Sequence, residues 1–262
     1  MPDQKSSRPG TLPTPESSGL RWRERDGIRW LEAELPGARA VFTTRLGGLS
    51  EGPFESLNLA RGTGDPAVGE NRLRLAAALG IDPELVLAGR QVHGSDVARH
   101  EAPPDPPAFA RSAPGLAVAD GQSTARRDLV PLVLVADCLP VALVGSGGVA
   151  MIHCGWRGMA SGIVARGARE VGASAAAVGP GIGPCCYEVG PEVIAAFDAL
   201  GPGVAEGRML DLREAARRLL RSAGVTRIEV SELCTRCHSE LFYSHRRDGE
   251  RAGRQAGLVW IA

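Results

Sequence analysis

Apolar residues fall in runs that predict β-strands along most of the chain. Two segments on either side of the Pro36-Gly37 turn read as paired strands, and continuous apolar runs bounded by turn residues are typical of strands buried on both faces. The strands predicted in this way cover residues 28–35, 38–44, 85–94, 129–137, 140–145, 148–154, 173–180, 226–233 and 256–262.

Helices are predicted between these strands from their start and stop signals. Asp65-Pro66 offers a cap and a first-turn proline, Pro191 suits a first helical position, and Asp211 with Glu214 has the spacing of a capping box. The predicted helices cover residues 67–80, 159–172, 191–200 and 211–220. Since strands and helices interleave without an internal repeat, the pattern indicates an α/β or α+β protein with a large mixed sheet.

Composition narrows the class of protein. The 262 residues include 44% apolar and 23% charged side chains with a formal net charge of zero, so nothing favours binding to nucleic acid or to an anionic membrane. Residues 1–20 are rich in Pro and Ser and are predicted to be a disordered tail, which leaves 21–262 as a single folded domain. The chain has no secretory h-region and no membrane-spanning run, so we expect a cytoplasmic protein with reduced cysteines.

Three residues at the ends of predicted buried strands could hold a metal: His93, Cys138 and His153. Two imidazoles and a thiolate leave one position of a tetrahedral Zn²⁺ open, as in catalytic zinc sites. Copper could use the same ligands with Met151 or Met159 as a weak axial ligand. Ordinary buried histidines and a buried thiol are the alternative without a metal.

Two arginines beside glycine turns are candidate anion contacts. Arg157 lies in GWRG, directly after the strand that ends with His153, and Arg45 lies in TTRLGG. A guanidinium there could bind a phosphate or carboxylate through paired hydrogen bonds.

Residues 234–249, CTRCHSELFYSHRRDG, carry the spacing of a haem-attachment motif at Cys234, Cys237 and His238. Covalent haem is disfavoured because its attachment normally follows export. Cys234 and Cys237 are interpreted as packing thiols near the active-site wall, with a second zinc site as the less favoured alternative.

Taken in order, the motifs TTRLGG, SLNLA, GENR, QVHGSDV, ADCLPVAL, IHCGWRG, GPGIGPCCYEVGPEV, CTRCHSELFYSHRRDG and GRQAG resemble those of the YfiH family from about residue 25 onwards. Members have been labelled laccase-domain or multicopper polyphenol oxidase proteins and are now described as purine nucleoside phosphorylases. The resemblance implies mixed β-sheets sandwiched by helices, a fold like that of a deamidating toxin with cysteine-hydrolase character. It also implies zinc on His93, Cys138 and His153.

The resemblance further implies phosphorolysis of adenosine, inosine and 5′-methylthioadenosine, with adenosine deamination at the same site. Catalytic roles are then expected for the three ligands and for Arg45 or Arg157 on phosphate. This chain reads ADGQST (119–124) where members often read ADALVT, so a more polar loop after Asp120 is expected to alter substrate preference.

Three alternatives remain open from the sequence. Cys138 could be the nucleophile of a cysteine hydrolase or deamidase, acting on peptidoglycan precursors with His93 or His153 as base. Copper-dependent polyphenol oxidation is a second. A non-catalytic metal-binding module is the third, and it would require a fourth ligand such as Cys154 or Asp137.

Overall fold

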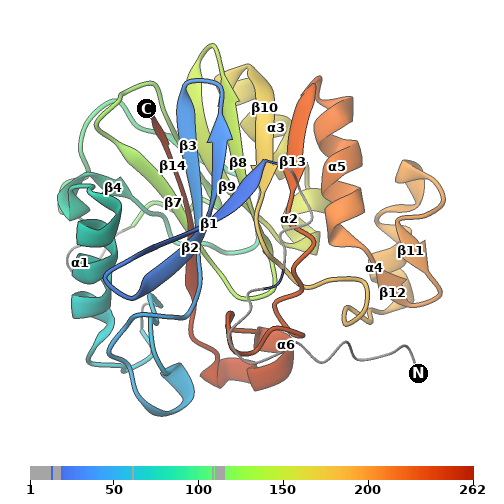
Figure 1. Ribbon diagram of the computed structural model, residues 1–262. Coiled ribbons are helices and arrows are strands. Elements are labelled where there is room, and N and C mark those ends of the chain that lie inside the picture. The colour runs from blue at the N-terminus through green and yellow to red at the C-terminus, as the bar shows by residue number, and fades with distance from the viewer. Residues whose placement is uncertain (1–12, 14–18, 61, 108, 110–115) are drawn as a thin grey trace.

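Two β-sheets of six strands each make up the centre of the computed structural model, which describes residues 13, 19–60, 62–107, 109 and 116–262 (Figure 1). The first sheet has the spatial order β1 (Leu20–Arg25), β2 (Ile28–Leu35), β3 (Ala38–Thr43), β14 (Gln255–Ile261), β7 (Val130–Val135) and β4 (Val86–Leu87). The second has the order β13 (Arg227–Val230), β10 (Ala173–Val178), β8 (Leu139–Gly145), β9 (Gly148–Cys154), β6 (Gly121–Thr124) and β5 (Val97–Arg99).

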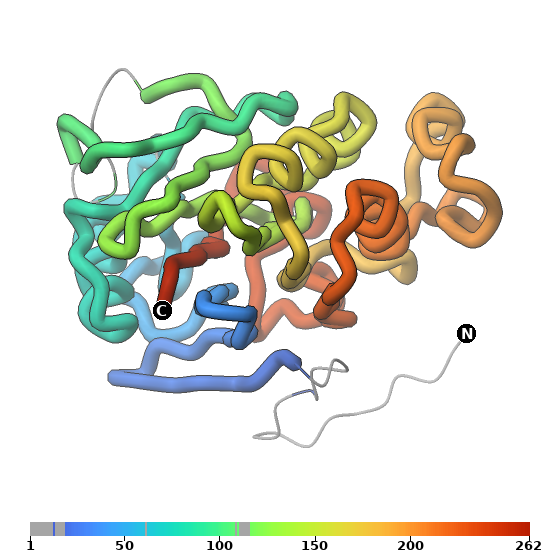
Figure 2. Tube along the Cα trace, turned by 90° about the horizontal axis from the view of Figure 1, so that it is seen from above, coloured from blue at the N-terminus to red at the C-terminus, as the bar shows by residue number. Residues whose placement is uncertain are grey.

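Helices cover the outer faces of both sheets. In Figures 1 and 2, α1 lies at one side of the molecule, and the pair β11 (Ala205–Glu206) and β12 (Met209–Leu210) lies at the opposite edge. The α-helices are α1 (Val68–Leu79), α2 (Trp156–Ala160), α3 (Ile163–Val171), α4 (Pro191–Ala195), α5 (Leu212–Ser222) and α6 (His245–Asp248). Short 3₁₀ turns are η1 (Gly52–Phe54), η2 (Pro83–Leu85), η3 (Asp198–Leu200) and η4 (Gly249–Arg251).

Three apolar cores hold these layers together. One fills the space between the sheets and includes Leu31, Phe42 and Met151. The second lies between the second sheet and helices α3 and α5, and the third lies between the first sheet and α1. Each fully buried Leu or Phe stabilises the fold by about 1.5–3 kcal/mol, so strands that are apolar on both faces become central strands here.

Strand pairing is mixed, as the interleaved pattern predicted. Most neighbours are antiparallel, while β4 with β7, β5 with β6 and β10 with β13 are parallel. The predicted class of mixed sheets with helices on their faces is confirmed. Its cysteine-hydrolase-like character stays a prediction.

Four local predictions were wrong. The helix expected over 191–200 is the short helix α4 followed by the 3₁₀ turn η3. Residues 85–94 form a strand only at β4, because backbone N–H groups further along are bound by the Asp120 carboxylate instead of a neighbouring strand. The helix expected over 159–172 is two helices, α2 and α3, separated at Gly162 with φ of 89°. The supposed loop after Asp120 is the buried strand β6.

Among the described residues, regular structure begins at Leu20 with β1, and the division into a tail over 1–20 and a domain over 21–262 stays a prediction. Residues 1–12 and 14–18 of the expected tail lie outside the described residues, as do residues 108 and 110–115 of the proline-rich loop. Among the described residues, no helix is both long and apolar enough to cross a membrane.

Candidate metal centre and cavity

Three side chains from distant parts of the sequence meet at one end of the second sheet. His93 comes from the irregular segment after β4, Cys138 from the turn before β8, and His153 from β9. Their ligand atoms all lie within 4.8 Å of one another, and the two imidazole centroids are 4.8 Å apart. Because β8 pairs with β9 so that Pro140 faces His153, the turn residue Cys138 comes beside that imidazole.

Asp120 fixes both histidines. Its buried carboxylate binds His153 Nδ1 at 2.8 Å, which leaves Nε2 for the thiol or a metal. The same carboxylate accepts N–H bonds from Val92, His93 and Gly94 at 3.0, 2.9 and 2.8 Å, and these bonds hold His93 at a φ of 61°. Sequence reasoning gave Asp120 no such role, since an aspartate before a strand has no distinctive spacing.

The charges of the three groups are coupled. Although burial opposes it, the field of His153 and hydrogen bonds from His153 and His93 lower the pKa of Cys138 to about 6. Against the effect of burial, the Cys138 thiolate and the hydrogen bond to Asp120 raise the pKa of His153 to about 9. Without a metal, Cys138 and His153 therefore form a thiolate–imidazolium pair at neutral pH.

These residues suit a metal ion with one open position. The thiolate and two imidazoles are the ligand types that Zn²⁺ prefers, and the carboxylate–histidine contact is the usual outer partner of such a ligand. The fourth ligands considered from the sequence are not in place. Asp137 instead accepts hydrogen bonds from Thr235 Oγ1 and Arg246 N, both at 2.6 Å, and buried Cys154 is outside the three-residue group.

The three ligands open onto a cavity of about 950 Å³. Several basic side chains lie on its wall, although the protein has no net charge. The basic lining residues are Arg90, Arg157, Arg246, Arg254 and His245. Trp156 and Tyr187 add aromatic surface, and Glu250 adds a carboxylate, so a polar anionic ligand with an aromatic ring matches this wall.

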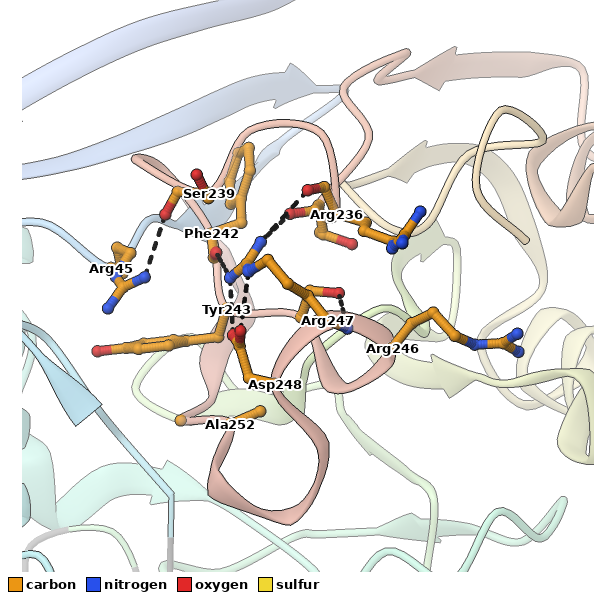
Figure 3. A network of polar contacts seen from close by, with 12 residues as sticks. Arg45, Arg236, Ser239, Phe242, Tyr243, Arg246, Arg247, Asp248 and Ala252 are labelled. Atoms are coloured by element: carbon orange, nitrogen blue, oxygen red, sulfur yellow. Dashed lines mark hydrogen bonds and ion pairs between the residues drawn. The ribbon is translucent and has the colours of Figure 1, made fainter. Parts of the chain in front are cut away.

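The two predicted anion-binding arginines lie in different surroundings. Arg157 lines the cavity, and its guanidinium stacks on Trp156 at 4.5 Å. Arg45 is not among the cavity-lining residues. It donates to the Ser239 carbonyl at 3.1 Å and to the Glu55 carbonyl, and it stacks on Tyr243 at 4.6 Å (Figure 3).

The segment that follows Tyr243 forms one wall of the cavity. Figure 3 shows Arg246 pointing away from Arg247, whose guanidinium is held by Asp248 at 2.8 Å and by the Phe242 carbonyl at 3.0 Å. Arg246 stacks on Tyr187 at 5.1 Å. The SHRRDG segment (244–249) thus supplies the basic side chains of His245 and Arg246 to the cavity wall.

Neither methionine considered for copper lines the cavity. Met151 is buried between the sheets and Met159 under the second sheet. The axial ligand of a blue-copper site is therefore not supplied by either residue.

Fold and site together define a mixed α/β protein with a Cys–His metal-binding arrangement in an arginine-lined cavity. The family model described as "Multi-copper polyphenol oxidoreductase laccase" matches residues 39–262. The chain therefore belongs to this laccase-like family, the YfiH family of the sequence motifs.

Relatives cover almost the whole chain. It is 38% identical to "Purine nucleoside phosphorylase YlmD" of Geobacillus stearothermophilus, over 88% of this chain and 93% of the relative. It is 39% identical to a "Purine nucleoside phosphorylase" of Deinococcus radiodurans, over 90% and 94%. The crystal structure of Bacillus licheniformis YfiH superposes with a TM-score of 0.82 at 33% identity, over 92% of this chain and 99% of that one.

Proposed function

We propose that this protein is a zinc-dependent purine nucleoside phosphorylase that acts on adenosine, inosine and 5′-methylthioadenosine. The observation that carries the proposal is the three-ligand centre opening onto an arginine-lined cavity. The names of the relatives support the same activity. The nucleoside and the phosphate are both small molecules. This agrees with the cytoplasmic location expected from the sequence, and the reaction requires no nucleic acid or membrane.

Phosphate would be bound by Arg157, with Arg246 and Arg254 on the same wall. Arg45 is a weaker candidate because it is not among the residues that line the cavity. A phosphate oxygen forms a bond to ribose C1′ while the bond from C1′ to purine N9 breaks. The electron pair leaves with the purine, which takes up a proton, and ribose 1-phosphate is the second product. The protein contributes positioning and charge stabilisation.

The purine would lie against the aromatic part of the wall. Trp156 and Tyr187 both line the cavity, and each already carries a stacked guanidinium, from Arg157 and Arg246 respectively. A purine between them would gain stacking of about 1–3 kcal/mol per ring contact. The Glu250 carboxylate could accept hydrogen bonds from ribose hydroxyls or from the adenine amino group.

His93, Cys138 and His153 would hold the zinc, and Asp120 would keep His153 in the tautomer that binds it. When bound, zinc supplies a Lewis acid that acidifies water toward neutral pH, the chemistry needed for deamination of adenosine. We therefore propose adenosine deamination as a second activity of this site, supported by the zinc that His93, Cys138 and His153 would hold.

The test is to incubate zinc-loaded protein with adenosine, with and without phosphate, and to identify the products by chromatography. Adenine that forms only with phosphate is the expected result, and inosine that forms without phosphate would establish deamination. Arg157→Ala should raise KM for phosphate about 10–100-fold, because a hydrogen bond to a charged group is lost. Arg166→Ala, on an exposed arginine paired with Asp96, is the matched control. Failure to form either product would contradict the proposal.

A cysteine hydrolase is the second candidate, because the structure arranges Cys138, His153 and Asp120 as a nucleophile, base and orienting carboxylate. We would expect such an enzyme to hydrolyse amides in peptidoglycan precursors without metal. Chelation separates the two candidates: a hydrolase keeps its activity in the zinc-free state and loses it on alkylation of Cys138.

A further inference from the structure

Four cysteines outside the cavity centre form a second cluster of ligand atoms. Cys185 and Cys186 lie in the turn after β10, and Cys234 and Cys237 follow β13. All four sulfur atoms lie within 4.8 Å of one another. Cys237 Sγ is 3.6 Å from Cys185 Sγ and 3.4 Å from Cys186 Sγ.

The fold brings these sequence-distant pairs together through one sheet edge. Because β10 and β13 are parallel neighbours, the segments that follow them leave the sheet side by side. They continue to pair at the bridge between Gly181 and Cys234, where Thr235 N donates to the Gly181 carbonyl at 3.0 Å. The turn at Gly183, whose carbonyl accepts from Cys186 N at 3.0 Å, then directs the paired cysteines toward Cys234.

The spacing of the sulfurs matches a tetrahedral thiolate site. A Zn–S distance of about 2.3 Å places the corners of a tetrahedron about 3.8 Å apart. The measured contacts of 3.4 and 3.6 Å are close to this edge and far longer than the roughly 2.05 Å of a disulfide. None of the four cysteines is in a disulfide. We propose that Cys185, Cys186, Cys234 and Cys237 bind a structural Zn²⁺, separate from the cavity centre.

A backbone hydrogen-bond donor and two arginines lie around the cluster. Cys234 Sγ accepts a hydrogen bond from Gly183 N at 3.2 Å. A zinc ion with four thiolates carries a net charge of −2, and two arginines lie beside it. The Arg236 side chain binds Cys186.

Arg213 is the second of these arginines, and it is only 5% exposed. A Cβ added at Gly183 would lie 2.6 Å from Arg213 Nη2 and 3.3 Å from Cys185 Sγ, so the guanidinium and the thiol flank the same glycine. Among the described residues, its Nε and Nη1 atoms have no hydrogen bond, although Nε is 3.7 Å from Asp211 and Nη1 is 3.2 Å from Glu232. This buried guanidinium places positive charge beside the sulfur atoms, and it also pairs with the two carboxylates.

The proposed zinc would fix the wall of the cavity. Ile182 and Tyr187 line the cavity from either side of the Cys185-Cys186 turn. On the other segment, Arg247 donates to the Thr235 and Arg236 carbonyls at 3.2 and 3.4 Å (Figure 3). The four protein ligands leave no open position, which is typical of a zinc that stabilises structure rather than one that catalyses.

The test counts metals and reads their ligands without using activity. Elemental analysis should find two zinc ions per wild-type chain, one in Cys185→Ser/Cys237→Ser, and one in His93→Ala/Cys138→Ala. The exposed positions of Cys185 and Cys237 favour correct folding of the first double variant. Cobalt added to wild-type protein should give the intense thiolate-to-metal absorption of an S₄ site, and His93→Ala/Cys138→Ala should keep that absorption.

Several results would overturn the proposal. One is an unchanged zinc count in Cys185→Ser/Cys237→Ser, and another is wild-type protein without an S₄ cobalt spectrum. Iron in place of zinc, or a disulfide found among these four thiols in protein purified under reducing conditions, would also contradict it. Since none of these measurements uses a nucleoside, failure of the phosphorylase proposal would leave this one standing.

Discussion

The acidity of the Cys138 thiol follows from its neighbours. The positive field of His153 and hydrogen bonds from both histidines outweigh burial and lower its pKa to about 6. Cys154, one residue beyond His153, has only burial and nearby negative charges, so its pKa is raised. Two thiols close together therefore differ in charge at neutral pH, although composition gives no reason to separate them.

This difference predicts site-selective alkylation of zinc-free protein. Because a lowered pKa means that the thiolate is present above about pH 6, the rate at Cys138 should rise through pH 6 and level off above pH 7. Cys154 should stay unmodified throughout. Iodoacetamide labelling followed by peptide mass mapping separates the cysteines, and zinc should protect Cys138. A Cys138 rate that rises only above pH 8 would contradict this account.

Asp120 is the residue on which the centre depends without being a ligand. Asp120→Asn removes the charged partner of His153 and should weaken zinc binding about 10–100-fold. Competition with a chelating dye measures the affinity. Asp96→Asn, at an exposed aspartate paired with Arg166, should leave it unchanged. Equal affinities for Asp120→Asn and wild type would show that the carboxylate is not an outer partner of the metal.

At the scale of single elements, the pattern of apolar residues predicted the strands that are stabilised by packing in the apolar cores. β2 and β9 have the predicted boundaries, and β3, β8 and β10 differ little, since each is buried within a core. The predicted elements were wrong where long-range hydrogen bonds to side chains determine the backbone conformation. The segment from Val92 to Gly94 gives its N–H groups to Asp120, a partner 26 to 28 residues away, which no local pattern encodes.

The strand β6 escaped prediction for a different reason. Its residues Gly121–Thr124 are small and polar, yet all are buried between β9 and β5. Gln122 Oε1 lies 2.7 Å from His100 Nε2, and Thr124 Oγ1 donates to the His100 carbonyl at 2.9 Å. Tertiary hydrogen bonds therefore satisfy these polar groups. A strand that is stabilised in this way has no apolar signature in its sequence.

Helix α5 has the Asp211 cap that the sequence indicated, but Glu214 does not complete the capping box, because its carboxylate binds Arg217 and Arg218. The Asp211 carboxylate accepts hydrogen bonds from Arg213 N at 2.9 Å and Glu214 N at 3.2 Å. Asp211→Ala should therefore cost about 1 kcal/mol of folding free energy, seen as a fall in Tm of about 2–4 °C. Asp211→Asn keeps a capping oxygen and should lose much less. Equal Tm values for the Ala variant and wild type would contradict the cap.

At the scale of the whole molecule, the three candidate ligands of the cavity centre could be predicted from the sequence, but the contacts that bring them together could not. Their assembly depends on the β8–β9 register and on Asp120, both of which are long-range features. The cysteine cluster could not be predicted from the sequence for the same reason. The spacing of Cys234 and Cys237 suggested a ligand pair, but their proximity to Cys185 and Cys186 follows only from the parallel pairing of β10 and β13.

The central claim is that zinc on His93, Cys138 and His153 is required for turnover, and one titration tests it most directly. Zinc is removed from the wild-type protein and then added back in steps, and His93→Ala/Cys138→Ala, which has only the cysteine cluster on this account, is titrated beside it. Bound zinc and adenosine phosphorolysis are measured at each step. We predict that activity rises with the zinc that the wild-type protein binds beyond the one ion taken up by the variant, and that the variant stays inactive. Full phosphorolysis by the zinc-free chain would contradict the claim.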